Sequence, residues 1–186
     1  MTDKKLIKYR LYFLIFITIS IWLLLFWSHF NGGVPGHHVL NRKDLPEISN
    51  WWGGISIPML TWFLLYRVQR RLGNRVNDSE FPPAILYAFA GALCFGILLS
   101  VFFTAGFADI PFYMMVGLLI LSLFFPVYRA ECFLGLVLGM TYTFGGVLPI
   151  GIVSILTSIG AILYLIGRGG KRLATSLLTT GESQNN

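Results

Sequence analysis

The chain has 186 residues, of which 55% are hydrophobic and only 12% are charged. A soluble domain carries roughly 25% charged residues, so this composition, with its long apolar runs, indicates a chain that lies in a lipid bilayer. The formal net charge of +6 raises the question of nucleic acid. The basic residues lie at the ends of apolar runs, however, where they set membrane orientation, so no nucleic-acid partner is expected.

Six apolar segments are predicted to be transmembrane helices, and they cover about residues 7–27, 48–66, 84–105, 112–128, 131–147 and 150–166. The last two come from one apolar stretch that is too long for a single crossing, and Gly145, Gly146 and Pro149 supply the turn that divides it. A long polar loop over residues 28–47 separates the first two, and a short polar tail over residues 173–186 is expected to be frayed or disordered. The predicted fold is an all-α integral membrane protein with a single six-helix domain over residues 1–172.

The distribution of Lys and Arg predicts the orientation of these helices. With the N-terminus in the cytoplasm, only Arg42 and Lys43 of the basic residues near the helix ends fall outside. An odd number of helices would move the terminal cluster Arg168–Arg172 to the outside, so the even number and two cytoplasmic termini are favoured. We expect an integral protein of the bacterial inner (plasma) membrane.

Small residues predict which helices pack tightly, because helices in lipid associate through close backbone approach. Three stripes at helical spacing are visible: Ala88, Ala92, Gly96 and Ser100; Gly135, Gly139 and Thr143; and Gly151, Ser154, Ser158 and Ala161. The third, fifth and sixth helices are therefore expected to form the tight contacts, within the chain or with a membrane-protein partner or second copy. The first helix is bulky, and it and the fourth are expected to face lipid more.

No Asp, Glu, Lys, Arg or His lies in the middle of any predicted span. Proton-coupled pumps, carboxylate-based exchangers and intramembrane proteases depend on such groups, so these classes are disfavoured. Glu131 comes closest to a span, and an interfacial ion pair with its neighbour Arg129 is the expected arrangement.

The outer loop and the residues that follow it form the candidate binding site. Its candidate ligand-binding residues are His37, His38, Asp44, Glu47, Asn50, Trp51 and Trp52. Ser56, Thr61, Thr104, Thr141, Tyr142 and Thr143 are polar side chains that could extend a pocket into the bundle. No cofactor is predicted, although His29, His37 and His38 with a carboxylate could bind a zinc or copper ion.

Each of these features also has a structural interpretation. Adjacent histidines diverge on a strand or helix, so His37 and His38 could share a metal only on an irregular backbone. Without one, the loop is a solvated connection, and Trp51 and Trp52 belong to the aromatic belt at the membrane surface. The basic connector between the second and third helices fits the positive-inside rule, and its alternative role is contact with anionic lipid headgroups through Arg67, Arg70, Arg71 and Arg75.

In size, number of spans and cytoplasmic ends, the predicted architecture resembles the substrate-capturing subunits of energy-coupling-factor vitamin importers. That resemblance implies a ligand bound from outside beneath the first loop. The AxxxA pattern that those subunits carry on their first helix is absent from residues 7–27, so the resemblance covers architecture alone.

Three functions follow from these observations. The first is a solute-binding or transport protein with an outward-facing site under the first loop. The second is a structural or assembly subunit of a membrane complex. The third is a membrane enzyme with a His and carboxylate site at the outer leaflet, and the lack of a recognisable catalytic motif makes an enzyme the less favoured class.

Overall fold

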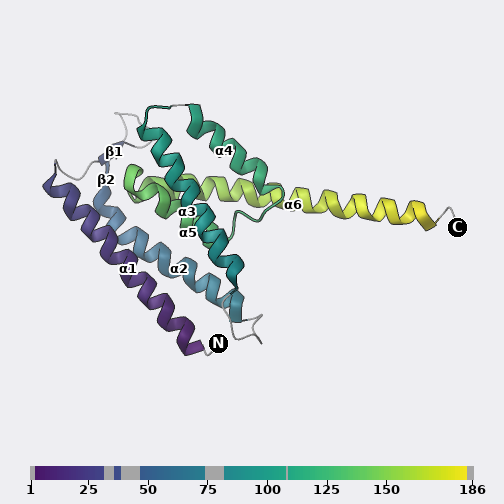
Figure 1. The fold of residues 1–186 in the computed structure, drawn as a ribbon, viewed down its shortest axis with the longest axis horizontal. Helices are drawn as coiled ribbons and strands as arrows, with labels where there is room; N and C mark the ends of the chain where they lie inside the picture. The colour runs from purple at the N-terminus through teal and green to yellow at the C-terminus, as the bar shows by residue number, and fades with distance from the viewer. Residues whose placement is uncertain (1–2, 32–35, 39–46, 74–81, 108, 184–186) are drawn as a thin grey trace.

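The computed structural model describes residues 3–31, 36–38, 47–73, 82–107 and 109–183. Nearly all of these residues are helical, and the helices are α1 (Asp3–Phe30), α2 (Gly53–Gly73), α3 (Pro83–Thr104), α4 (Asp109–Ser122), α5 (Ala130–Phe144) and α6 (Val147–Ser183). Two short antiparallel strands, β1 (Gly36–His38) and β2 (Glu47–Ser49), lie between α1 and α2 (Figure 1). A single 3-10 turn, η2 (Asn50–Trp52), connects β2 to α2.

Three helices of the described chain are long and apolar enough to cross a membrane, and these segments are Ile7–Phe30, Pro83–Thr104 and Val147–Gly169. Helices α4 and α5 are apolar but shorter. Large hydrophobic side chains such as Phe16, Tyr87 and Ile155 are exposed on these helices. An apolar exterior of this kind is costly in water and favourable in lipid, so the helices are compatible with a membrane protein.

Two predicted helix boundaries are wrong at the polar segments. The second helix does not begin near Ile48, because Ile48 pairs with His37 in the β-hairpin and Ser49 then caps the 3-10 turn before α2 starts at Gly53. The fourth helix ends at Ser122 rather than at Tyr128. Consecutive turns follow it, and Pro126, which has no N–H to donate, lies among them.

The expectation of a frayed tail also differs from the structure. Helix α6 continues without interruption from Val147 to Ser183, and its second half projects away from the other helices (Figure 1). The residues after Arg172 contain neither a proline nor an isolated turn motif that would end the helix. The break between the fifth and sixth helices is where the sequence predicts it, since Gly145 ends α5 with φ of 75°.

Helix α5 is the most enclosed part of the chain, and it packs against α3 through glycine. A Cβ atom placed on Gly139 would lie 2.6 Å from the Leu93 carbonyl oxygen, and one on Gly135 would lie 2.5 Å from that of Phe89. On the facing helix, a Cβ on Gly96 would lie 2.8 Å from the Leu136 carbonyl oxygen. The backbones therefore touch along the two stripes that the sequence predicts to pack closely.

The order of these contacts gives the helix directions. Phe89 faces Gly135 and Gly96 faces Gly139, so α3 and α5 run parallel. The rings of Phe13 in α1 and Phe89 in α3 are 5.8 Å apart, which places the starts of α1 and α3 at the same end of the molecule. Helix α2 runs in the opposite direction, because its last turns contact the beginnings of both α1 and α5.

The small-residue face predicted for the sixth helix is not the face that α6 buries. Gly151 and Ser158 are exposed, whereas Val153, Thr157 and Gly160 are buried. A Cβ on Gly160 would lie 3.2 Å from the Ser122 Cβ of α4. Helices α4 and α5 together cover the buried face of α6, and their contribution could not be anticipated from α6 alone.

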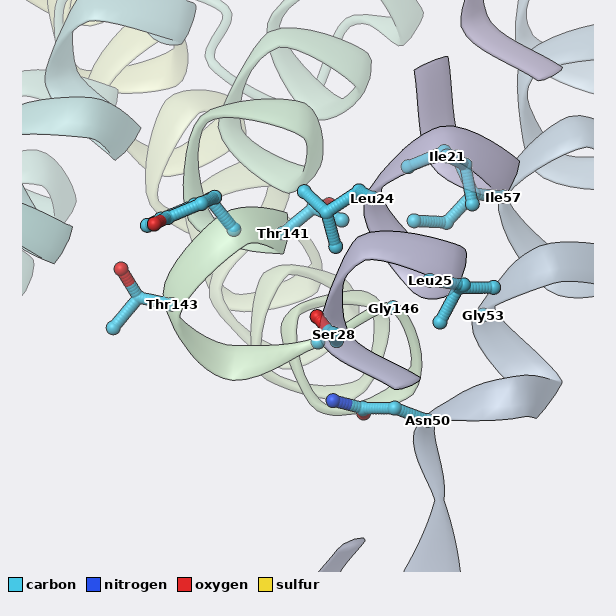
Figure 2. A pocket seen from close by; sticks show the side chains of 12 residues that line it. Ile21, Leu24, Leu25, Ser28, Asn50, Gly53, Ile57, Thr141, Thr143 and Gly146 are labelled. Atoms are coloured by element: carbon cyan, nitrogen blue, oxygen red, sulfur yellow. The ribbon is translucent and has the colours of Figure 1, made fainter. Parts of the chain in front are cut away.

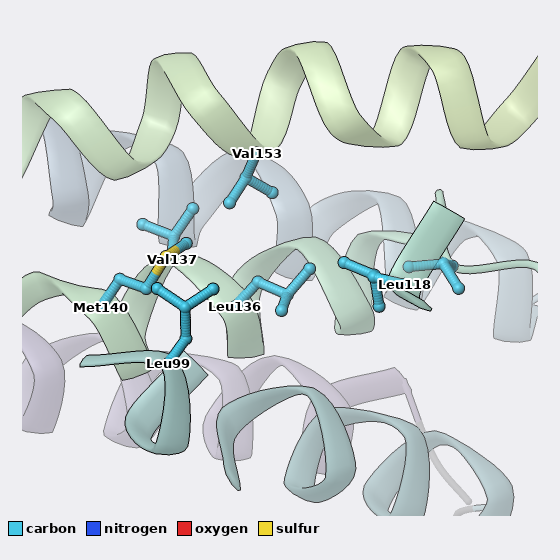
Figure 3. Close-up of a cluster of buried hydrophobic side chains, with 7 residues drawn as sticks. Leu99, Leu118, Leu136, Val137, Met140 and Val153 are labelled. Carbon is cyan, nitrogen blue, oxygen red and sulfur yellow. The ribbon is translucent and has the colours of Figure 1, made fainter. Parts of the chain in front are cut away.

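Among the described residues, two apolar clusters fill the interior. The larger contains Leu99, Leu118, Val127, Leu136, Val137, Met140 and Val153, and it joins α3, α4, α5 and α6 (Figure 3). The smaller contains Ile17, Ile21, Leu25 and Ile57, and it joins α1 to α2. The rest of α1 is mostly exposed, as expected for a helix that faces lipid.

The glycine contact between α3 and α5 gives a stability prediction. Gly139→Ala should lower the free energy of unfolding by about 1–3 kcal/mol, because the new methyl group forces the two backbones apart. Gly91→Ala is the matched control, since a Cβ at Gly91 of α3 meets nothing within 4 Å. It should be neutral or stabilising by up to about 1 kcal/mol through helix propensity. Thermal unfolding in one detergent measures both, and a Gly139→Ala variant as stable as Gly91→Ala would contradict the close contact.

Candidate functional site

Polar residues gather at two opposite ends of the group formed by α1, α2 and α5. At one end, here called the hairpin end, Ser28 of α1, Asn50 of η2 and Gly145 after α5 lie beside the β-hairpin. At the other, the basic end, Arg71 of α2 pairs with Glu131 of α5, and Arg10 of α1 donates to Gln69 of α2. Between the two ends, Ile17, Ile21, Leu25 and Ile57 form an apolar cluster.

A glycine junction builds the hairpin end. A Cβ on Gly53 would lie 3.0 Å from the Gly146 Cα atom, so the start of α2 and the turn between α5 and α6 meet backbone to backbone. The side-chain amide of Asn50 occupies the space where a Cβ of Gly145 would project, and the φ of 75° at Gly145 is itself unfavourable for other residues. The sequence Asn-Trp-Trp-Gly-Gly at residues 50–54 thus holds Asn50 against the turn between α5 and α6.

A small cavity of about 40 Å³ lies at this junction (Figure 2). Its wall combines aliphatic and polar residues of α1, η2, α2, α5 and the turn before α6, and these are Ile21, Leu24, Leu25, Ser28, Asn50, Gly53, Ile57, Thr141, Tyr142, Thr143, Gly145 and Gly146. One water molecule needs roughly 10–15 Å³ by this measure, so the cavity has room for about three waters or a comparably small solute. Sites for drug-sized ligands are about 300–1,000 Å³, so a large ligand would require the helices to separate.

The polar side chains of the pocket differ in what they already bind. Thr141 donates its hydroxyl to the Val137 carbonyl oxygen at 2.7 Å. Within the described residues, the side chains of Ser28, Asn50 and Thr143 make no hydrogen bond. Their donors and acceptors are therefore free for a solute, and none of the described residues that line the cavity is charged.

The structure brings only part of the predicted site to this pocket. Asn50 lines it, and so do Thr141, Tyr142 and Thr143, whereas Ser56, Thr61 and Thr104 do not. Trp51 instead packs in an aromatic cluster, with ring centroids 5.9 Å from His29 and 6.3 Å from both Trp22 and Phe26. Trp52 is exposed and outside the lining.

For the remaining loop residues the structure describes only the backbone of the two strands, and the rest of the loop lies outside the described residues. His38 pairs with Glu47 in the register of the hairpin, and His37 pairs with Ile48. Asp44 lies outside the described residues. Residues 36–38 form a regular strand rather than the irregular backbone that a shared metal ion would need, and the described residues contain no group of three metal-binding side chains. The metal site at His29, His37 and His38 stays a prediction.

At the basic end, the expected pair of Glu131 with Arg129 is wrong. Glu131 is only 3% exposed, and its Oε1 accepts a hydrogen bond from Nη2 of Arg71 at 2.8 Å. Arg129 is exposed at the N-terminal end of α5. Residue 131 lies in the buried face of α5, which turns toward α2, so the partner comes from the neighbouring helix rather than from the neighbouring residue.

The four arginines predicted to contact lipid headgroups separate into different environments. Arg67 and Arg70 are exposed, Arg71 is engaged with Glu131, and Arg75 lies outside the described residues. Arg10, which was not among them, stacks its guanidinium group 3.9 Å from the Trp62 ring centroid and donates to Gln69 at 2.8 Å. Contact with lipid headgroups therefore stays a prediction for Arg67, Arg70, Arg71 and Arg75.

Two parts of the site escaped the sequence analysis, namely Ser28 and the contact of Asn50 with Gly145. The available signal was the recurrence of Gly-Gly at residues 53–54 and 145–146, which marks two backbones able to approach closely.

No family model, no curated protein and no solved structure matches the chain.

The glycine junction predicts a non-additive pair of substitutions. Gly145→Ala should destabilise the protein by about 1–3 kcal/mol, because it adds a clash with Asn50 to an unfavourable φ. Asn50→Ala should remove the clash, so the double variant should be more stable than the sum of the single effects implies.

Gly151→Ala serves as the control for this cycle, since a Cβ at Gly151 meets nothing within 4 Å. Thermal unfolding of the variants measures the coupling. Strictly additive effects of Gly145→Ala and Asn50→Ala would show that the two residues do not touch.

Proposed function

We propose that the chain is a six-span membrane protein that binds a small, neutral polar solute from the outer face and takes part in its transport. The observation that carries this proposal is the pocket at the hairpin end, where Ser28, Asn50 and Thr143 lie above an apolar floor and bond no other described residue through their side chains. The described lining residues carry no charge, which favours a neutral solute, since a buried ion requires a charged or strongly polar partner.

Helix directions support six spans. Because α1 and α3 start at the same end, the chain must cross back through α2, and the parallel pair α3 and α5 requires a second return through α4. Helix α5 has 15 residues, or about 22 Å, which is short against the ~30 Å hydrocarbon layer. It is enclosed by other helices, so the match between its own length and the lipid matters less than for an exposed helix.

The basic residues support the placement of the hairpin end outside. Lys8 and Arg10 begin α1, and Arg67, Arg70 and Arg71 end α2, so these cations lie at the basic end. Lys and Arg are concentrated on the cytoplasmic side of membrane proteins. The pocket would then open away from the cytoplasm.

Solute binding predicts ligand-dependent stability. The purified protein should be stabilised in a thermal-shift screen by at least one small neutral polar solute, with about 2.7 kcal/mol at a concentration 100-fold above Kd. Asn50→Ala should abolish the shift by removing an amide from the pocket. Asn31→Ala is the matched control, because Asn31 lies just after α1, is exposed, and bonds the Trp27 carbonyl oxygen instead.

Two results would contradict solute binding. The first is the absence of a shift with every solute of a broad panel. The second is a shift that persists in Asn50→Ala, which would place the binding elsewhere. Stabilisation by zinc or copper that is lost in His37→Ala or His38→Ala would instead support a metal site in the loop.

An assembly subunit is the second candidate, and the exposed face of α6 favours it. Gly151 and Ser158 lie on this face with no neighbour to fill the space beside Gly151. Small residues exposed to lipid allow another helix to approach closely. A stoichiometric partner that co-purifies with the wild type and is lost on Ser158→Leu would favour this candidate, whereas a solitary monomer in detergent would argue against it.

A further inference from the structure

One face of α2 connects the pocket to the ion pair at the basic end. Its positions recur every three or four residues, the spacing of a single helix face, and they are Gly53, Ile57, Thr61, Leu64, Val68 and Arg71. Gly53 and Ile57 line the pocket, and Arg71 bonds Glu131. All the positions between these two ends are buried.

The section next to the pocket is apolar. Ile21, Leu25 and Ile57 form both the floor of the pocket and most of the smaller apolar cluster. Ile17 completes the cluster on the side away from the pocket. In the conformation that the structure shows, these four side chains separate the pocket from the half of α2 that carries Arg71.

One turn beyond Ile57 lies a buried hydroxyl without a partner. Thr61 is 0% exposed, and within the described residues its Oγ1 atom makes no hydrogen bond. A buried hydroxyl is unfavourable unless it is bonded. A polar solute or water that moved past Ile57 would supply the missing bond.

Between Ile57 and Thr61, α2 contains Pro58. Proline cannot donate to the carbonyl four residues earlier, so the helix lacks one backbone hydrogen bond at Gly54. Proline is a common place for a helix to bend. The half of α2 that lines the pocket and the half that carries Arg71 can therefore change their relative angle at this point.

The basic end is held by two polar contacts of α2. Arg71 binds Glu131 of α5, and Gln69 accepts from Arg10 of α1. The second carboxylate oxygen of Glu131 is buried and has no partner within the described residues. The charge of this carboxylate is thus compensated by Arg71, and separation of the pair requires water to reach Glu131.

We propose that the Arg71–Glu131 ion pair is the closed inner gate of a pathway that begins at the pocket, and that α2 bends at Pro58 to open it. This inference rests on the proposed transport function. The structure has the arrangement of an outward-facing state. A pocket lies at the hairpin end, and polar contacts hold the helices together at the basic end. Opening the gate should move α2 toward the pocket and close the hairpin end.

Cys132, half-buried beside Glu131, is a natural reporter of the gate. In a Cys94→Ala background, a membrane-impermeant maleimide would be applied to the cytoplasmic side of inside-out vesicles. Arg71→Gln and Glu131→Gln should each raise the labelling rate of Cys132 at least fivefold over the parent. Arg70→Gln, which removes a neighbouring exposed arginine, is the matched control and should leave the rate unchanged.

The two substitutions separate access from reactivity. Loss of a positive charge near a thiol disfavours its reactive thiolate form, so faster labelling in Arg71→Gln reports access. If that variant fails to fold, Glu131→Gln leaves no buried carboxylate unpaired, but it also removes a negative charge beside the thiol. The outer reporter described next, which is far from that charge, then carries the test. The charge-reversed pair Arg71→Glu with Glu131→Arg should return the rate toward that of the parent.

A second reporter distinguishes a gate from a contact that is only structural. Ser28→Cys in a background that lacks both natural cysteines would be labelled from the outer side. Breaking the ion pair should reduce this labelling at least threefold, since the hairpin end closes as the basic end opens.

Three results would overturn the gate. They are an unchanged Cys132 rate in both variants, faster Cys132 labelling with unchanged Ser28→Cys labelling, and faster labelling at both ends. The thermal shift by a solute tests the pocket separately. A solute that still stabilises the protein while the reporters show no reciprocal change would leave the proposed function intact and reject the gate.

Discussion

The backbone contact between α3 and α5 is the constraint on which the rest of the structure depends. Gly96, Gly135 and Gly139 let the two helices touch along their length, which encloses α5 and presents its other faces to α2 and α6. Lipid supplies no hydrophobic force between helices, so this close approach must hold the bundle through dispersion and matched shape. The position of α5 then determines where Glu131 and the Gly145 turn lie.

Both polar ends of the molecule are built on that enclosed helix. At its start, Glu131 is buried against Arg71, and at its end, the Gly145 turn meets Asn50. Helix α2 runs antiparallel to α5 and supplies the partner in each case. A pocket, an apolar section and an ion pair therefore follow one another along a single helix face, an arrangement in which the two ends can respond to one another.

Composition and small-residue spacing predicted the apolar helices, the break at Gly145 and the contact of the third helix with the fifth. Predictions from these features were wrong where the packing of a residue or helix face depends on a segment far away in the sequence. The buried face of α6 depends on its packing against α4 and α5, and the partner of Glu131 depends on how α2 lies against α5. At the candidate site, Asn50 and the threonines of α5 could be anticipated as polar residues in apolar surroundings. Ser28 could not, since its place in the lining depends on how α1 packs against the start of α2.

The central claim is that six helices alternate across the membrane, with the hairpin end outside and both termini in the cytoplasm. The most direct measurement is the location of a reporter fused after Asn186 in intact bacterial cells, with green fluorescent protein active only inside and alkaline phosphatase active only outside. The account predicts a fluorescent fusion without phosphatase activity. If only the three long apolar helices crossed, the phosphatase would be active and the fluorescent protein dark, and that result would contradict the account.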